Sequence, residues 1–245
     1  TTPGAGLVAA SLMARALAAG AGAIALEITC GHGAHVPDAE PARATAALMA
    51  DLAAPWGRPV RWIVSDMSRP RGRCVGNALE VREAGEVLGG AGPADVRELA
   101  VRLAGDLAEA AGVVAAGQGR GAAERALDDG RALASAERWV EAQGGDPGVW
   151  SDPGALPMAP VRIDVVAPHD GWIAAIPARG IGEVARWLGV GRLHSDQSID
   201  PVTGIELPVS VGDRVAIGDP IAVVHARDEG AGERGRAMAA EWITL

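Results

Sequence analysis

A strand, a turn rich in proline and glycine, and a helix follow one another between residues 60 and 90. This unit limits the possible folds more than any other part of the sequence. Residues 60–65 (VRWIVS) form a short apolar run, which is typical of a buried strand. Proline and glycine in SDMSRPRGRC then interrupt regular structure, and a helix is predicted over Asn77–Leu88, ended by two glycines. A strand followed by a helix is the repeating unit of α/β proteins.

The residues before and after this unit continue the alternation. A helix is predicted over residues 9–19, and the alternating apolar residues of 23–29 (AIALEIT) predict a buried strand. Asp38 can cap a further helix, and Ala/Leu-rich helices are predicted over about 93–115 and 120–142. The helix over Asn77–Leu88 has a predicted apolar face, made of Ala78, Val81, Ala84 and Leu88. The first part of the chain is therefore predicted to be an α/β sheet covered by helices.

The composition changes at residues 144–160, a connector rich in proline and glycine. Beyond it, short β patterns dominate in RIDVVAP, WIAAIPA and VSVGDRVAIGDPIAVVHA. Helices are predicted at about 181–188 and 230–241, and the closing WITL is predicted to be a strand. The predicted order is an α/β domain over 21–143, a linker over 144–160, and a smaller, β-rich α+β domain over 161–245.

Composition excludes several classes of function. A net charge of −9 argues against a nucleic-acid-binding surface. The sequence contains no run of about eighteen apolar residues, so no membrane span is predicted. The start lacks the basic region of a secretory signal, which predicts a cytoplasmic protein. The VGDxVxxGxP pattern near the C-terminus is shared with lipoyl and biotinyl carriers. Those modules need a hairpin lysine, and all 22 basic residues here are arginine, so a covalent carrier is excluded.

Ser11 and Arg15 are the first candidate binding residues. They are four apart on a predicted helix, so their side chains project from one face. A hydroxyl beside a guanidinium suits a planar ligand rich in hydrogen-bond acceptors, such as a pyrimidine edge. An ordinary solvated arginine on a short helix is the alternative.

Cys30, His32 and His35 form a C-x-H-x-x-H string in a glycine-rich loop after a predicted strand. Sulfur and imidazole ligands can bind zinc, although a zinc site normally has a fourth ligand. The Gly31-His32-Gly33 backbone could instead approach an anion. Because α/β sheets bind ligands at the C-terminal ends of their strands, the position of this loop is itself informative.

Charged residues also surround the turn before Asn77. Arg69, Arg71 and Arg73 alternate through it and predict either an anion-binding patch or a set of solvated turn residues. Glu83 follows on the helix and could hold a hard cation together with turn carbonyls, because such cations prefer oxygen ligands. An exposed helical glutamate is the alternative.

Two strings, SLMARALAAGAGAIALEITCGHGAHV and SDMSRPRGRCVGNALEVREA, resemble the thymidine and pyrimidine-nucleoside phosphorylases. The resemblance continues through APHDGWIAAI, GVGRLHSDQSIDPVTGI and VGDRVAIGDPIAVVHA, and it covers the chain from about Leu7 to its end. It implies reversible phosphorolysis of a pyrimidine nucleoside to a free base and a pentose 1-phosphate, which is a pentosyltransferase reaction. It also makes residues 1–20 a remnant of a helical domain and 161–245 the family's C-terminal domain.

The resemblance assigns roles to particular residues. In this family a serine and a lysine four residues apart hold the base, and they fall on Ser11 and Arg15. A residue that packs on the base falls on His35, with Val36 beside it.

A second set of residues corresponds to an ion site. In the bacterial enzymes a potassium ion is held by two turn carbonyls and a glutamate, which fall on Arg71, Cys74 and Glu83. This potassium ion is the only cofactor that the resemblance suggests.

Three departures from the family pattern bear on the substrate. Arg15 replaces a lysine, which keeps the charge but changes the geometry. His35 replaces an aromatic residue and adds a titratable group. Where the family has an Asp-x-Lys motif, this chain has Glu27-Ile28-Thr29, and a different or modified base is therefore an alternative substrate.

The resemblance places the family's phosphate-binding glycine-rich loop, catalytic histidine and base-binding arginine ahead of the segment that this chain matches. We therefore expect no catalytic residue in this chain. We expect a C-terminal subunit that works with a separate N-terminal polypeptide, as a hetero-oligomer or a dimer of heterodimers, on a pyrimidine nucleoside and phosphate. The alternative is a non-catalytic relative that binds a nucleobase or regulates a partner.

Overall fold

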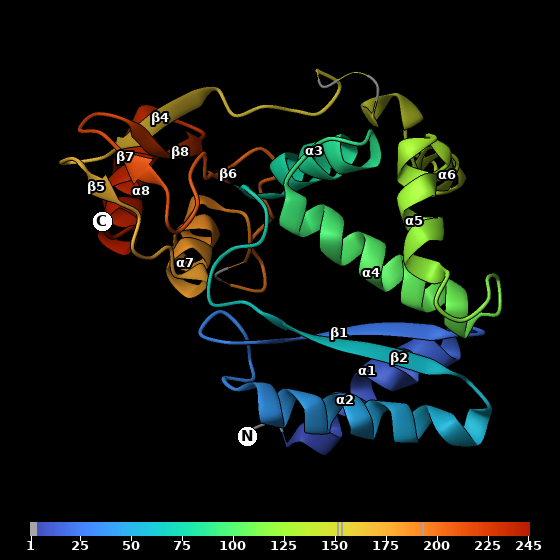
Figure 1. The fold of residues 1–245 in the computed structure, drawn as a ribbon. Helices are drawn as coiled ribbons and strands as arrows, with labels where there is room; N and C mark the ends of the chain where they lie inside the picture. Colours follow the sequence, from blue (N-terminus) through green and yellow to red (C-terminus); the bar gives the residue numbers. More distant parts are fainter. Residues whose placement is uncertain (1–3, 151, 153, 193) are drawn as a thin grey trace. The chain divides into compact units, whose positions relative to one another are not determined.

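The computed structural model describes residues 4–150, 152, 154–192 and 194–245, and their contacts divide into two compact units (Figure 1). The first unit contains the residues up to Met67 together with Arg97–Asp129. The second contains Ser68–Val96 together with Gly130–Leu245. Residues 68–96 therefore pack with the C-terminal part of the chain, and this division runs through the α/β domain that the sequence predicts over 21–143.

The first unit is built around two parallel strands. β1 (Ile24–Cys30) and β2 (Val60–Asp66) pair along their whole length, from Ile24 opposite Val60 to Cys30 opposite Asp66. α2 (Ala39–Ala53) and η1 (Ala54–Trp56) connect the strands. α2 packs against both strands, and α1 (Ala5–Ala18) packs against α2 (Figure 1). The strand–helix–strand order that the sequence predicts is confirmed here. The buried core of this part consists of Ala9, Met13, Ile24, Met49 and Ala53.

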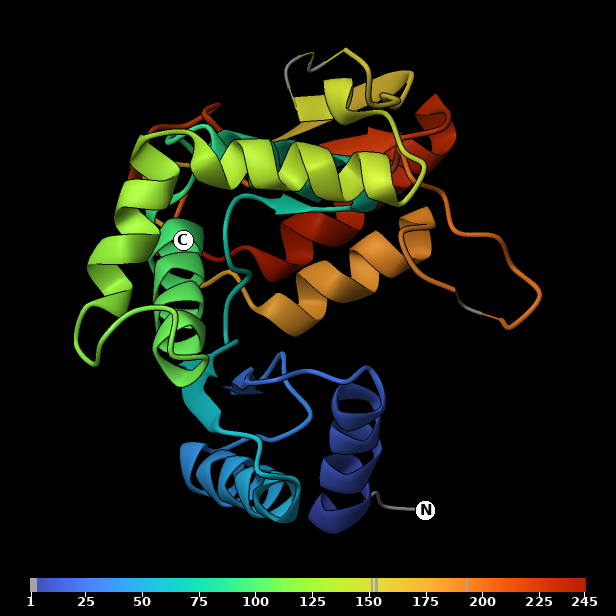
Figure 2. The same cartoon turned by 90° about the vertical axis from the view of Figure 1, so that its right-hand side faces the viewer.

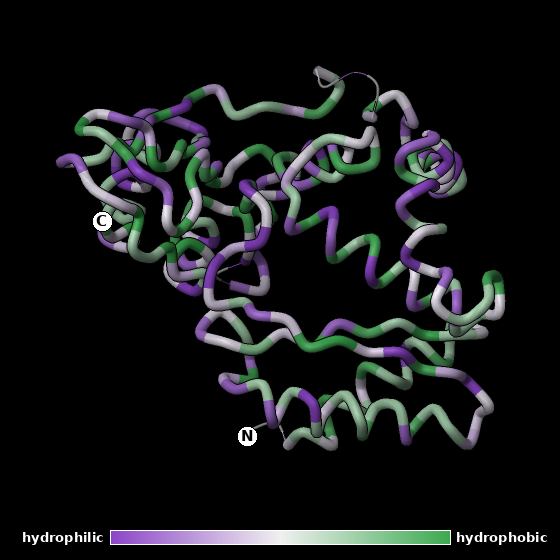
Figure 3. Tube along the Cα trace, viewed as in Figure 1, coloured by the Kyte–Doolittle hydropathy of each residue, from purple (hydrophilic) through white to green (hydrophobic). Residues whose placement is uncertain are grey.

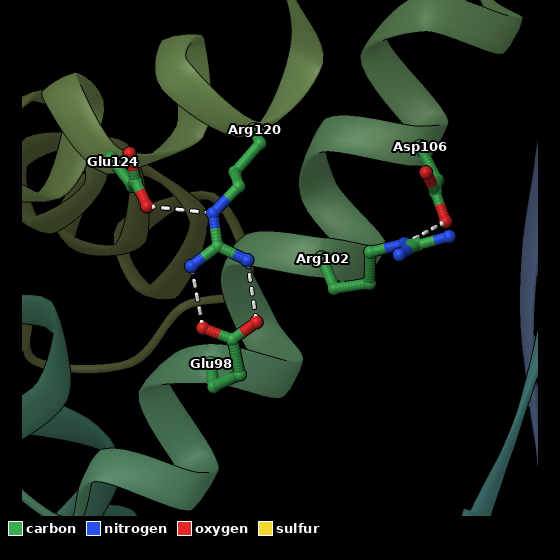
Figure 4. Close-up of polar contacts among 5 residues, drawn as sticks. All are labelled: Glu98, Arg102, Asp106, Arg120 and Glu124. Atoms are coloured by element: carbon green, nitrogen blue, oxygen red, sulfur yellow. Dashed lines mark hydrogen bonds and ion pairs between the residues drawn. The ribbon is translucent and has the colours of Figure 1, made fainter. Parts of the chain in front are cut away.

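Two helices complete the first unit. α4 (Ala94–Ala110) alternates hydrophilic and hydrophobic residues along its length (Figure 3), and α5 (Gly119–Asp128) follows it. Arg120 on α5 donates to both carboxylate oxygens of Glu98 on α4, at 2.5 and 2.7 Å (Figure 4). Arg120 also bonds Glu124 on its own helix, and Arg102 bonds Asp106 on α4. These pairs are largely exposed, and exposed pairs contribute little to stability.

Close contact between two glycines matters more for this helix pair. A Cβ atom on Gly105 would lie 2.7 Å from the backbone nitrogen of Arg120, and one on Gly119 would lie 2.2 Å from the carbonyl oxygen of Gly105. The backbones of α4 and α5 therefore touch where neither residue has a side chain. The Glu109 carboxylate also accepts a hydrogen bond of 2.8 Å from the Gly119 N–H at the start of α5.

We expect Gly105→Ala to lower the free energy of unfolding by about 1–3 kcal/mol, because the added methyl group meets backbone atoms that cannot rotate away. This cost exceeds the gain of up to about 1 kcal/mol that alanine brings to a helix. Urea denaturation followed by circular dichroism measures the change. Gly121→Ala is the matched control, because its Cβ would meet only the flexible end of Arg125, at 3.3 Å. Equal stability of the two variants would contradict the glycine contact.

The second unit contains an antiparallel four-stranded sheet in the order β3-β6-β8-β4. β3 (Cys74–Val75) belongs to this sheet although it is far in sequence from β6 (Gly204–Glu206). The other strands are β4 (Val161–Val166), β8 (Pro220–Ala226) and the separate pair β5 (Gly171–Trp172) and β7 (Arg214–Val215). The helices are α3 (Asn77–Leu88), α6 (Arg131–Ala142), η2 (Pro147–Trp150), α7 (Ala178–Leu188) and α8 (Glu229–Trp242).

The core of the second unit lies between its sheet and two helices. α8 packs against β4, β8 and α7, and the two helices lie side by side (Figure 2). Their contact is close, because a Cβ atom on Gly180 would lie 2.1 Å from the Trp242 ring. The largest buried side chains of this core are Val165, Ile173, Ile181, Val184, Ile205, Ile221 and Val224. The predicted fold class, an α/β part followed by a smaller β-containing domain, is confirmed.

The predicted apolar face of α3 is wrong. The buried residues of α3 are Ala78, Leu79, Glu83 and Val87, whereas Val81 is 37% exposed. The helix is therefore rotated relative to the face that apolar periodicity favours. The reason is that Glu83 points inward to accept a backbone hydrogen bond.

Two other predicted elements also differ. The helix predicted over 120–142 is interrupted at Gly130, whose φ of 79° separates α5 from α6. The predicted C-terminal WITL strand is wrong, because Trp242 ends α8 and only Thr244 forms an isolated bridge, to Ala175. Among the described residues, no helix is long and apolar enough to cross a membrane.

Candidate functional site

The predicted base-binding pair lies on α1 in the first unit. Ser11 and Arg15 are both exposed, whereas Ala9 and Met13 on the same helix are buried. The Arg15 Nε donates to the Ser11 carbonyl oxygen at 3.3 Å, so the two residues share one helix face. The guanidinium keeps its other N–H groups for a ligand, because Arg carries five donors.

The loop that follows β1 folds back on the end of that strand. Cys30 and Val36 form an isolated parallel bridge, and the Gly31 N–H donates to the carbonyl oxygens of Val36 and Pro37, at 3.2 and 3.1 Å. The Gly33 N–H donates to the Met67 carbonyl oxygen at 3.0 Å. His35 is exposed and Val36 is half-buried on this loop, so the imidazole ring is open to a ligand.

The zinc alternative fails on geometry. Within the described part of the chain, no group of three or more His, Cys, Asp or Glu side chains is placed to hold a metal ion. Cys30, His32 and His35 are therefore close in sequence without forming a ligand set.

Sequence reasoning missed one polar contact between the two strands. The Ser65 hydroxyl of β2 donates to the Glu27 carboxylate of β1, and both residues are partly buried. The parallel register places Ser65 opposite Thr29, two residues from Glu27. The pair therefore lies toward the C-terminal end of the strands, where α/β sheets bind ligands. The only feature of the sequence that could have indicated this contact is the Ser65 hydroxyl at the end of the strand predicted over 60–65.

The predicted ion ligands lie in the second unit, where a turn covers Glu83. Glu83 is 7% exposed, so the alternative of an ordinary exposed glutamate is wrong. Its Oε1 accepts a hydrogen bond of 2.7 Å from the Arg73 N–H. Gly72 has a φ of +70°, and a Cβ atom there would lie 2.2 Å from Glu83 Oε2. The turn backbone thus packs directly on the carboxylate, and only glycine fits at position 72.

The turn itself is fixed from two other directions. The Arg73 carbonyl oxygen accepts a hydrogen bond of 2.6 Å from the Leu207 N–H, and Cys74 pairs with Glu206 in the sheet. The Gly72 N–H donates to Asp95 Oδ2 at 3.1 Å. The peptide groups around Glu83 are therefore held in place by strand pairing and by Asp95, which belongs to the same unit.

Burial shapes the acid–base properties of this cluster. Burial raises the pKa of Glu83, and the carboxylates of Glu86 and Asp95 act in the same direction. Hydrogen bonds from the Arg73 N–H and the Cys74 thiol oppose the rise. Burial, together with Glu83, also raises the pKa of Cys74 to about 12, so this thiol stays protonated at neutral pH. A cation beside Glu83 would relieve both effects.

This pKa predicts a pH dependence of stability. Because the folded protein holds the Glu83 proton more tightly than the unfolded chain, the free energy of unfolding should fall as the pH rises from 4.5 through the folded-state pKa. The slope is at most about 1.4 kcal/mol per pH unit for one proton. Urea titrations in potassium-free buffer measure it. Glu83→Gln should remove this slope and the exposed control Glu241→Gln should keep it, whereas equal slopes in wild type and Glu83→Gln would contradict the assignment.

Comparison with known proteins agrees with the resemblance that the sequence motifs carry. Residues 172–244 match the pyrimidine nucleoside phosphorylase C-terminal domain. The chain is 40% identical to the pyrimidine-nucleoside phosphorylase of Geobacillus stearothermophilus over 226 residues, which is 91% of this chain and 52% of that protein. It is 38% identical to the Bacillus subtilis (strain 168) protein of the same name over 230 residues, 93% of this chain and 53% of that protein.

These matches confirm the resemblance to the thymidine and pyrimidine-nucleoside phosphorylase family. The chain spans about half the length of the curated relatives that it matches, since 52% and 53% of their residues are covered. The matched domain at residues 172–244 lies within the predicted C-terminal domain over 161–245.

Proposed function

We propose that this chain is the base-binding, C-terminal part of a pyrimidine nucleoside phosphorylase, which converts a pyrimidine nucleoside and phosphate reversibly to a free base and a pentose 1-phosphate. The observation that carries the proposal is the 40% identity over 91% of the chain with a protein named for this activity. The exposed Ser11 and Arg15 on one helix face are consistent with it.

The proposed roles follow from the chemistry of each side chain. The Arg15 guanidinium binds the polar edge of the base and stabilises the negative charge that the base acquires as its bond to the sugar breaks. The Ser11 hydroxyl hydrogen-bonds the same edge and helps to orient it. His35 packs its ring against the base, and Val36 supplies apolar contact beside it.

Phosphate binding and the general acid would come from polypeptide outside these 245 residues. We propose a separate N-terminal chain, so that the working enzyme is a hetero-oligomer. The 245 residues match about half of each relative, and that half is what they contribute to the proposed enzyme. Neither half alone would then place a base, a sugar and a phosphate together, which the reaction requires.

Potassium is proposed at the Glu83 turn, with the carbonyl oxygens of Arg71 and Cys74 as its other ligands from this chain. The donor set fits, because a carboxylate and carbonyls are the oxygens that hard cations prefer. The raised pKa of Glu83 supports the assignment, since burial and two neighbouring carboxylates disfavour its charge until a cation compensates. The ion would hold the turn in place and would take no chemical part in the reaction.

Potassium chloride should therefore stabilise the protein more than choline chloride at the same concentration. A potassium concentration ten times the dissociation constant adds about 1.4 kcal/mol to the free energy of unfolding. Differential scanning calorimetry measures the shift. The shift should disappear in Glu83→Gln and persist in Glu241→Gln. A potassium effect that survives in Glu83→Gln would rule out this site.

Copurification tests the proposed partner. The chain is tagged and isolated from its native cells, and the bound proteins are identified by mass spectrometry. We expect a polypeptide that matches the other half of the relatives, in a constant ratio to this chain. Isolation of the chain in an assembly that lacks any such polypeptide would contradict the proposal.

A non-catalytic protein that binds a nucleobase or regulates a partner is the second candidate. The exposed Arg15 and Ser11 favour base binding whether or not turnover follows. Calorimetric titration with uracil and thymine distinguishes the two candidates when it is combined with activity assays. Binding without turnover in any mixture would favour the second candidate.

A further inference from the structure

A small cavity in the second unit has no role in the proposed reaction. Its volume is about 250 Å³, and it is lined by the turn over 69–73, the first residues of α4 and the segment 207–211, with Ile176. This is slightly below the range of about 300–1,000 Å³ that is typical of pockets for drug-sized ligands. The space therefore suits a small metabolite rather than a nucleoside.

Two of the three arginines in the turn are among the residues that line this cavity, and both are exposed. Arg69 and Arg73 line it, and Arg71 does not. In the described structure, neither the Arg69 nor the Arg73 guanidinium has an ion-pair or hydrogen-bond partner, whereas many other arginines of the chain are paired with carboxylates. Two unpaired guanidinium groups on one small cavity match a doubly charged anion, because the planar fork of arginine fits phosphate oxygens.

The remaining walls carry two other kinds of group. Asp95 accepts hydrogen bonds from the Gly72 N–H at 3.1 Å and from the Val96 N–H at 3.0 Å, which fix its carboxylate at the edge of the cavity. Ser210 adds a hydroxyl group. Ile176 and Leu207, only 4% and 3% exposed, provide an apolar floor. A carboxylate and a hydroxyl bind the hydroxyl groups of a ligand, and the floor contacts its carbon chain.

From this arrangement we infer that the cavity binds a small organic phosphate that carries hydroxyl groups. The phosphate pairs with Arg69 and Arg73, and the hydroxyl groups bond Asp95 and Ser210. Inorganic phosphate can pair with the two arginines but has no carbon-bound hydroxyl groups for Asp95 and Ser210, so it binds more weakly than the organic phosphate. Nothing in this assignment depends on phosphorolysis, and it lies beyond the base-binding and ion-binding roles proposed above.

Occupancy of the cavity would also steady the turn over Glu83. Gly72 lines the cavity, and its position is so close to Glu83 that a Cβ atom would lie 2.2 Å from the carboxylate. A ligand that binds both Arg69 and Arg73 restrains both ends of the turn over residues 69–73. Binding of the organic phosphate and of potassium should therefore favour each other, as any two ligands of one ordered segment do.

Isothermal titration calorimetry of the 245-residue chain tests the inference, with glycerol 3-phosphate, inorganic phosphate and glycerol as probes. We expect glycerol 3-phosphate to bind more tightly than inorganic phosphate and glycerol not to bind. Arg69→Ala and Arg73→Ala together should weaken glycerol 3-phosphate at least about tenfold, since each lost charged hydrogen bond contributes substantially. Arg214→Ala, an exposed arginine of β7, is the control and should leave binding unchanged.

Three outcomes would overturn the inference. They are the absence of glycerol 3-phosphate binding, equal binding of inorganic phosphate, and unchanged binding in the double arginine variant. Circular dichroism of each variant checks that it is folded. Arg15→Ala should bind glycerol 3-phosphate normally, so the inference can fail or succeed independently of the proposed phosphorylase activity.

Discussion

Replacing Arg15 with alanine is expected to lower kcat/KM for phosphorolysis by about 10²–10³-fold in the assembled enzyme. The departing base becomes negatively charged, and Arg15 is the only cation that the proposal gives this chain for stabilising it. The residue is exposed on α1, and among the described residues its guanidinium bonds only to the Ser11 carbonyl oxygen, at 3.3 Å, so its removal should not disturb folding. Steady-state rates with uridine and thymidine measure the effect.

The controls separate charge from structure. Arg15→Lys keeps the charge and should retain much more activity than Arg15→Ala, although its geometry differs. Arg43→Ala on α2 removes an exposed arginine of the same unit, which pairs with Glu40 at 3.4 Å, and should leave the rate unchanged. An Arg15→Ala enzyme as active as Arg43→Ala would remove this residue from the proposed mechanism.

Gly72→Ala should have the largest effect on stability, a loss of about 2–5 kcal/mol in the free energy of unfolding. The backbone has a φ of +70°, which strains any residue with a side chain. The added methyl carbon would also lie 2.2 Å from Glu83 Oε2 and 2.9 Å from Val96 Cγ2. Urea denaturation followed by circular dichroism measures the loss, and the stabilisation by potassium should disappear in the same variant.

Two comparisons isolate the clash with Glu83. Gly212→Ala meets nothing within 4 Å at a φ of +96°, so it reports the cost of backbone strain alone. We expect Gly72→Ala to cost clearly more. Adding Glu83→Ala to Gly72→Ala should recover part of the loss, because the carboxylate that the methyl group meets is then absent. If the double variant is no more stable than the sum of the single variants predicts, the packing of Gly72 on Glu83 is not the cause.

Local patterns in the sequence predict the strands and helices of the first unit well. The alternating apolar residues of 23–29 and the short apolar run of 60–65 locate β1 and β2 to within about a residue of their observed bounds, and glycines mark where helices end. The interruption at Gly130 was missed because the Ala/Leu-rich residues on both sides of it continue a helical composition. A single glycine can be tolerated inside a helix, so its left-handed φ of 79° could not be read from the sequence.

Local sequence patterns could not predict the pairing of strands that are far apart in the chain. β3 has only two residues, and nothing in CV indicates that it pairs with β6, a strand more than a hundred residues later. That pairing draws residues 68–96 into the second unit. It also explains Glu83, which periodicity places on a polar face. Glu83 is buried because β3 and the preceding turn bring the Arg73 N–H onto its carboxylate.

The candidate site was predictable to different degrees. The four-residue spacing of Ser11 and Arg15 suffices to place them on one face, and the structure shows them so. Spacing failed for Cys30, His32 and His35, because loop residues close in sequence need not converge in space. Arg69 and Arg73 are lining residues of the cavity and Arg71 is not, a difference that the alternation of the three arginines in sequence does not reveal.

Phosphorolysis by separated and mixed components tests the central claim most directly. This chain, the copurified partner and their mixture are each assayed for release of free base from uridine and thymidine in phosphate buffer. The account predicts that the mixture releases base in a phosphate-dependent reaction, and that each component alone is inactive. Release of base by this chain alone, or by no mixture at all, would contradict it.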